Sequence, residues 1–188
     1  MKADFVRFRT MRQMAGGSKL FRSLDILAWP MFHATVVFRL ARAAERHRLS
    51  PIARILMYLN EVVWFVELSS KAVVGPGLIM LHPGNGCAAG TRIGRNCTMV
   101  MFVHMGVAGR SDPTKDGTPT IGDDVVLSAN SSVWGPVTVG SRSTIGTGVR
   151  VMKDVPEDSL VIAEQAQRVI TRAPKPAPAD AEVPEQVG

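Results

Sequence analysis

The sequence predicts a mainly β fold in which very short strands wind into a β-helix of three-faced coils, preceded by an α-helical segment. The first observation behind this prediction is a six-residue period of aliphatic residues. Neither an amphipathic helix, with a period of 3.6, nor a half-buried strand, with a period of 2, produces such a period. Repeats of this length instead build a β-helix in which one residue per face points into a narrow core. The aliphatic positions in register are Ile121, Leu127, Val133, Val139, Ile145 and Val151, with shorter blocks at Leu68, Val74 and Met80 and at Ile93, Met99 and Met105.

Two further observations support the same fold. Glycine follows the aliphatic position in many of the repeats, at Gly75, Gly94, Gly106, Gly122, Gly140 and Gly146. Aromatic residues make up only 6% of the chain, which suits a narrow prism filled by Val, Ile and Leu. The alternative is chance alternation in an ordinary β sheet, and six consecutive matches in register argue against it.

Residues 1–66 are predicted to form an N-terminal helical segment. Apolar residues recur at helical spacing between residues 24 and 47, and Pro30 is expected to start or kink that helix. Ser50 and Pro51 are the residue types of an N-cap and a first-turn proline, which predicts a second helix running to the end of the segment. We expect the two helices to stack as a platform beside the first coil.

The repeat domain is predicted to occupy residues 67–172. One interruption, residues 107–118, is rich in turn-forming residues and lacks the aliphatic period, so we expect an extended loop that leaves the prism. Residues 173–188 alternate Ala and Pro with acidic residues, which predicts a disordered tail.

The charge and the cysteine content of the chain limit the partners that it can bind and the cell compartment in which it works. The net charge is +6, and half of the Lys and Arg residues lie in residues 1–66. A basic segment can meet an anionic membrane surface or acidic cofactors such as coenzyme A. No nucleic-acid-binding motif is present, so we expect no nucleic-acid partner.

Cys87 and Cys97 form no disulfide framework and no metal spacing, and no signal peptide or membrane span is evident. These features predict a cytoplasmic protein that binds no metal. For the basic helices two alternatives stay open, namely peripheral contact with the inner membrane or an ordinary solvated surface.

Four blocks of the chain resemble the hexapeptide-repeat acyltransferases, and within them the serine acetyltransferase branch. The resemblance implies a left-handed β-helix, an exception to the usual right-handed crossover. It also implies a homotrimer with active sites between subunits, acetyl-CoA as co-substrate in the groove between two prisms, and a hydroxyl-bearing acceptor. The four blocks are Glu67 to His82, Val103 to Gly106, Pro119 to Asn130, and Ile145 to Gly148 followed by Lys153 to Pro156.

Glu67 and His82 are the candidate catalytic residues. O-Acetylation needs a base that removes the proton of the acceptor hydroxyl, and histidine suits this because its pKa lies near neutrality. A carboxylate on the other ring nitrogen fixes the tautomer and stabilises the imidazolium. In an eighteen-residue coil, residues fifteen apart lie nearly one turn apart, so both can sit near one edge. The alternative for His82 is an ordinary surface histidine before Pro83. His104 replaces a family threonine and either lines the site or stays outside it.

The resemblance also implies residues that contact acetyl-CoA. A backbone N–H around Gly106 and Val107 is expected to face the oxyanion of the tetrahedral intermediate. Backbone groups of Ala129 and Thr147 match positions that hydrogen-bond the pantetheine arm. Lys153 is expected near the nucleotide phosphates, with a plainly solvated lysine as the equal alternative.

The chain departs from the serine branch at the acceptor positions. Leu81 stands where that branch has an aspartate before the catalytic histidine, and Gly117 and Thr118 stand where it has an Arg-His pair. An amino acid needs a cation for its carboxylate and an anion for its ammonium group. The sequence therefore favours a sugar hydroxyl over L-serine, as in the exopolysaccharide O-acetyltransferases of this branch, which the Leu81-His82-Pro83 run also resembles.

Three functions remain open on the sequence alone. The first is acetylation of a sugar in polysaccharide biosynthesis, and the second is acetylation of L-serine for cysteine biosynthesis. The third is a trimeric scaffold or binding module that has lost turnover. The scaffold is favoured by residues 164–167, Glu-Gln-Ala-Gln, which replace a family Gly-Asn-Pro-Ala block close to bound coenzyme A.

Overall fold

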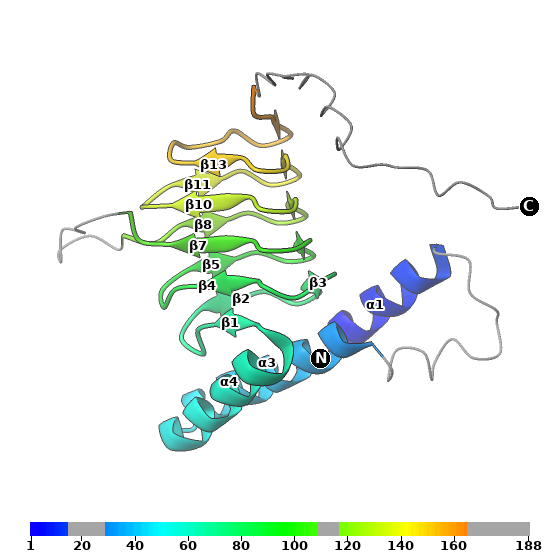
Figure 1. The fold of residues 1–188 in the computed structure, drawn as a ribbon, viewed down its shortest axis with the longest axis vertical. Helices are drawn as coiled ribbons and strands as arrows, with labels where there is room; N and C mark the ends of the chain where they lie inside the picture. Colours follow the sequence, from blue (N-terminus) through cyan, green and yellow to red (C-terminus); the bar gives the residue numbers. More distant parts are fainter. Residues whose placement is uncertain (15–28, 109–116, 165–188) are drawn as a thin grey trace, which may run out of the picture.

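The computed structural model describes residues 1–14, 29–108 and 117–164. The predicted tail, the end of the predicted repeat domain and most of the predicted loop 107–118 lie outside the described residues. From Glu67 onward the chain winds into the predicted left-handed β-helix, a prism with three faces of stacked parallel strands (Figure 1).

Each face of the prism is one parallel sheet whose members recur at every third strand, apart from β14, which pairs with β12. The first face is β1 (Glu67–Leu68), β4 (Gly86–Cys87), β7 (His104–Gly106), β10 (Ser132–Trp134) and β13 (Arg150–Val151). The second is β2 (Val73–Val74), β5 (Arg92–Ile93), β8 (Thr120–Ile121) and β11 (Thr138–Val139). The third is β3 (Ile79–Met80), β6 (Thr98–Met99), β9 (Val126–Leu127), β12 (Thr144–Ile145) and β14 (Leu160–Val161).

The aliphatic residues that define the period point into the prism and stack from coil to coil. On the first face, Leu68, Cys87, Met105 and Val133 are successive partners in register, and all of them are buried. The partners are eighteen residues apart between β4 and β7 but nineteen apart between β1 and β4. The extra residue lies in the turn between β3 and β4, which carries His82.

Glycines at one corner allow successive coils to approach closely. Gly75, Gly94, Gly122 and Gly140 follow the strands of the second face, one in each coil. A Cβ atom added to Gly122 would lie 2.6 Å from the backbone nitrogen of Ser141 in the next coil. This is closer than side-chain and backbone atoms can pack, so the corner requires glycine.

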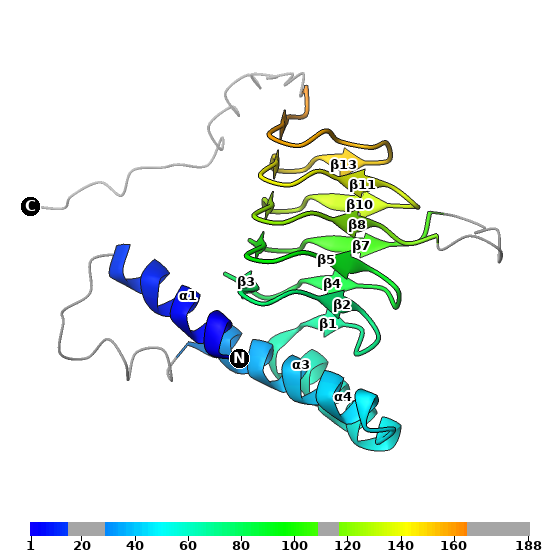
Figure 2. The same ribbon diagram turned by 180° about the vertical axis from the view of Figure 1, so that it is seen from behind.

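The helical segment covers the open end of the prism (Figures 1 and 2). It comprises α1 (Lys2–Met14), α3 (Pro30–Arg46) and α4 (Ser50–Trp64). Pro30 starts α3 as predicted, but Ser50 is the first residue of α4 rather than its N-cap. Leu49 holds the cap position and makes no side-chain cap bond, because a leucine side chain has no acceptor. None of the described helices is long and apolar enough to cross a membrane.

The helices dock through apolar and ionic contacts. Met31 and Phe38 of α3 join the core of the prism. Asp4 of α1 is buried and accepts hydrogen bonds from the backbone nitrogens of Gly77 (2.9 Å) and Leu78 (3.0 Å) and from Arg39. Burial alone would raise the pKa of Asp4, but the bonds from Arg39 and the N-terminal ammonium outweigh it and lower that pKa. The platform is therefore fixed to the first coil.

We expect Gly122→Ala to destabilise the prism by about 1–3 kcal/mol, because the new methyl group overpacks the corner against Ser141. Urea unfolding followed by circular dichroism measures the loss. Thr138→Ala is the matched control, since Thr138 is exposed on the neighbouring strand and should change stability by no more than about 0.5 kcal/mol. Equal stability of the two variants would show that the corner can accommodate a side chain.

Candidate functional site

The outer side of the first face brings Glu67 and His104 to the two sides of one glycine. Glu67 pairs in register with Gly86, and Gly86 pairs with His104. A Cβ atom on Gly86 would lie 3.7 Å from Cβ of Glu67 and 3.2 Å from Cδ2 of His104. Because glycine leaves this space open, the exposed carboxylate and the exposed imidazole flank a common gap.

The imidazole of His104 contacts the backbone. Its Nδ1 lies 3.3 Å from the carbonyl oxygen of Phe102. A carbonyl oxygen only accepts hydrogen bonds, so Nδ1 is the donor in this contact. Nε2 of His104 has no hydrogen-bond partner among the described residues, and the side chain is exposed on the outer surface.

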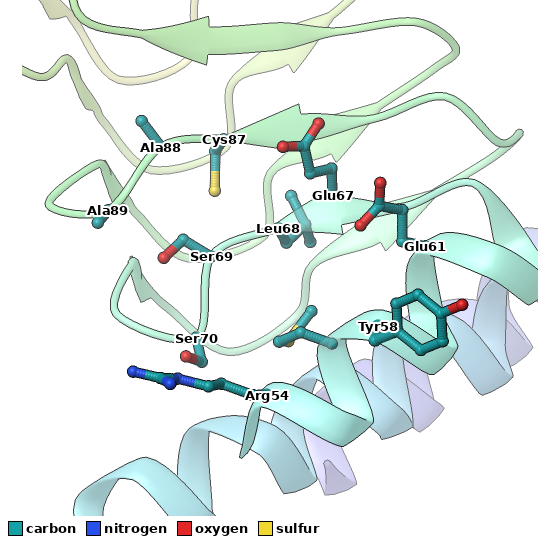
Figure 3. Close-up of a pocket in the computed structure, with 11 residues that line it drawn as sticks. Arg54, Tyr58, Glu61, Glu67, Leu68, Ser69, Ser70, Cys87, Ala88 and Ala89 are labelled. Atoms are coloured by element: carbon teal, nitrogen blue, oxygen red, sulfur yellow. The ribbon is translucent and has the colours of Figure 1, made fainter. Parts of the chain in front are cut away.

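A pocket of about 450 Å³ lies beside Glu67, between the first two coils and α4 (Figure 3). Helix α4 contributes Arg54 and Glu61, which are seven residues apart and thus lie on one side of the helix. Figure 3 shows Glu61 next to Glu67, with Arg54 toward the other end near Ser70. Within the described part of the chain, the side chains of Arg54 and Glu61 have no hydrogen-bond or ion-pair partner. The remaining lining residues are Met57, Tyr58, Leu68, Ser69, Cys87, Ala88 and Ala89.

Cys87 is not a nucleophile at this site. Burial raises the pKa of its thiol to about 12, so the thiol stays protonated at neutral pH. A thiol, unlike a thiolate, is a poor nucleophile and a poor metal ligand. Among the described residues, no group of three or more His, Cys, Asp or Glu side chains could hold a metal ion.

His82 lies in the turn after β3, exposed at the mouth of a different pocket of about 550 Å³. Its backbone is held on both sides, since its nitrogen donates to the carbonyl of Val100 (2.9 Å) and its carbonyl accepts from Asn85 Nδ2 (2.8 Å). The other side chains that line this pocket carry no charge. Its other lining residues are Trp29, Pro30, Met31, Val63, Trp64, Phe65, Leu81 and Pro83.

Within a single chain, the predicted catalytic pair of Glu67 and His82 is not formed. The two line different pockets, and no hydrogen bond between them occurs among the described residues. Their pairing stays a prediction.

The predicted acetyl-CoA positions fall on two edges of the first face. Ala129 and Thr147 lie in the turns that lead into this face, on the same edge as His82, and the Ala129 carbonyl accepts from the Gly148 nitrogen (3.0 Å). Gly106, Val107 and Lys153 lie at or beyond the ends of its strands, on the opposite edge. A groove containing all five positions would need one edge from each of two prisms.

Comparison of the sequence with known proteins finds both a matching family model and similar proteins. A family model described as bacterial transferase hexapeptide (six repeats) matches residues 118–153. The serine acetyltransferase of Helicobacter pylori is 32% identical over 146 residues, which are 77% of this chain and 84% of that protein.

Solved structures of serine acetyltransferases share the fold. The Neisseria gonorrhoeae enzyme in complex with serine is 25% identical, with a TM-score of 0.75 over 89% of this chain and 68% of that one. The Brucella abortus enzyme in complex with coenzyme A is 23% identical, with a TM-score of 0.76 over 86% of this chain and 64% of that one. The chain thus spans about two thirds of their length. With its identity to the Helicobacter enzyme across most of that protein, the chain belongs to the serine acetyltransferase family of hexapeptide-repeat proteins.

Proposed function

We propose that the chain transfers the acetyl group of acetyl-CoA to the side-chain hydroxyl of L-serine. Family membership supports the donor and the reaction, and the relatives solved with coenzyme A and with serine support the two substrates. The observation that carries the choice of acceptor is the pocket beside Glu67, which contains Arg54 and Glu61.

Arg54 and Glu61 supply the charges that an amino acid needs. The sequence favoured a sugar because Leu81, Gly117 and Thr118 offer no charged partner, but it gave no reason to look for those partners on a helix. Arginine binds a carboxylate through two parallel hydrogen bonds, and a glutamate accepts from an ammonium group. The two side chains emerge about 10.5 Å apart along α4, and their length allows them to converge on one small zwitterion.

The proposed acetyl transfer uses an imidazole as the general base and a carboxylate that orients it. His82, oriented by Glu67, takes the proton of the serine hydroxyl while that oxygen attacks the thioester carbonyl. The backbone N–H groups of Gly106 and Val107 donate to the oxyanion of the tetrahedral intermediate. When the intermediate collapses, the C–S bond breaks, and the imidazolium returns the proton to the departing thiolate.

The active assembly is proposed to be a homotrimer in the cytoplasm, where acetyl-CoA is available. Neighbouring prisms would bring the edge with His82, Ala129 and Thr147 against the edge with Gly106, Val107 and Lys153. This would place the predicted acetyl-CoA contacts along one groove and complete the pair of Glu67 and His82.

A sugar hydroxyl of a polysaccharide precursor is the second candidate acceptor. The observation that favours it is the apolar, aromatic pocket around His82, which lacks the charges that an amino acid requires but suits a neutral ring. A scaffold without turnover is the third candidate. Release of thiol from acetyl-CoA with any of the acceptors would exclude it.

We expect thiol release from acetyl-CoA with millimolar L-serine, and a rise in KM for L-serine of about ten- to a hundredfold in Arg54→Gln. The KM for acetyl-CoA should stay unchanged, because the charge lost is a partner of the amino-acid carboxylate. Arg48→Gln is the matched control, since Arg48 is exposed and does not line the pocket. Turnover of nucleotide sugars or glycolipids but not of L-serine would instead establish the second candidate.

We expect His82→Ala to lower kcat by at least about a hundredfold with little change in the KM for acetyl-CoA, because general-base catalysis contributes about 10²–10⁴. Glu67→Gln should lower kcat by a smaller factor, since the imidazole of His82 remains. His104→Ala provides the comparison, because His104 also flanks the gap beside Glu67. If His104→Ala rather than His82→Ala abolished turnover, the base would be His104.

A further inference from the structure

The solvent-facing side of α4 is apolar along its whole length. Its buried side faces α3 and the prism with Ala53 and Asn60. The opposite side, which we call the α4 face, carries large apolar side chains whose exposed fractions range from 42% to 70%. These are Ile52, Ile55, Tyr58, Leu59, Val62 and Val63, followed by Phe65 at the end of the helix.

Such a face is more than scattered surface hydrophobicity. Single exposed apolar residues are normal, whereas a contiguous row of them marks an interaction site. Positions 52, 55, 59, 62 and 63 recur at the spacing of one helix side, so their side chains form a continuous strip. Arg54 and Glu61, the charged residues of α4, lie on its flank and line the pocket beside Glu67.

The charge around the α4 face favours an anionic partner. Residues 1–66 contain eleven of the 22 Lys and Arg residues but only four of the 16 Asp and Glu residues. Among the described residues of the three helices and their connections, Glu61 is the one exposed acid. The exposed cations there include Arg46 and Arg48, at the turn between α3 and α4, whereas Arg54 lines the pocket.

We propose that the α4 face docks on the surface of an anionic phospholipid bilayer. A helix with an apolar strip and flanking cations lies in the plane of the membrane interface, where its side chains enter the acyl boundary and its arginines meet the headgroups. Two platforms that are both strongly basic would repel each other, which disfavours a second copy as the partner of this face. The proposed contact is peripheral, with α4 lying on the membrane surface.

This docking would place the pocket beside Glu67 next to the bilayer. Glu61 and Arg54 border both the pocket and the α4 face, so the pocket opens along the flank of the docked helix. The proposal does not depend on the identity of the acceptor, because it rests on the apolar side chains of α4 and the basic residues around them.

Sedimentation with vesicles tests the proposal on the full chain. Wild type should pellet with vesicles of phosphatidylcholine and phosphatidylglycerol, less with phosphatidylcholine alone, and less at high salt. Ile55→Glu combined with Val62→Glu should lower the bound fraction at least about tenfold, because two charges enter the apolar strip. Val73→Glu is the matched control, since Val73 is 47% exposed but lies on the second face of the prism.

Thiol release with L-serine and circular dichroism establish that the double variant remains folded, and neither residue lines the pocket. Failure of wild type to pellet with either vesicle would overturn the proposal, as would equal pelleting of the double variant. A smaller particle for the double variant in light scattering would show that the α4 face joins two copies instead. Loss of all acetyl transfer in wild type would refute the proposed function but leave the vesicle result intact.

Discussion

The structure depends on the stacking of each coil on the one before it through parallel backbone hydrogen bonds. This stacking places residues about eighteen positions apart directly above one another, so an inward position becomes a column of core and an outward position becomes a column on the surface. The inward column on the first face, Leu68, Cys87, Met105 and Val133, is buried from end to end. In such a one-dimensional array each coil is stabilised mainly by its neighbours.

The same stacking generates the candidate site. Glu67, Gly86 and His104 are far apart in sequence, but register makes them one outward column, and the missing side chain of Gly86 opens the gap between the other two. The extra residue between β3 and β4 interrupts the regular step at the turn with His82. Helix α4 completes the arrangement, since it closes the prism at β1, supplies Arg54 and Glu61 to the pocket and exposes its apolar side to solvent.

Much of the fold could be predicted because one inward residue every six positions is required by the geometry of the coil. The period located the strands of all three faces except β4 and β14, whose residues lie outside the aliphatic series. The two predicted helices were confirmed as α3 and α4, and Pro30 starts α3, whereas α1 was not predicted. The start of α4 was placed one residue late, because a proline in the first turn fits either Leu49 or Ser50 as the cap. The charged residues of the pocket could not be predicted, since Arg54 and Glu61 belong to a helix whose orientation depends on tertiary packing. The relation of His104 to Glu67 could not be predicted either, because it requires the register of three strands, and the step from β1 to β4 is nineteen residues rather than eighteen.

A shared active site is the central claim, because one chain leaves Glu67 and His82 in separate pockets and spreads the predicted acetyl-CoA positions over two edges. The most direct test is light scattering of the purified chain at micromolar concentration, with acetyl transfer measured across the same dilution series. The account predicts a particle of three times the 20.3 kDa of one chain, with activity lost where dilution dissociates it. A monomer of 20.3 kDa that retained full activity would contradict it.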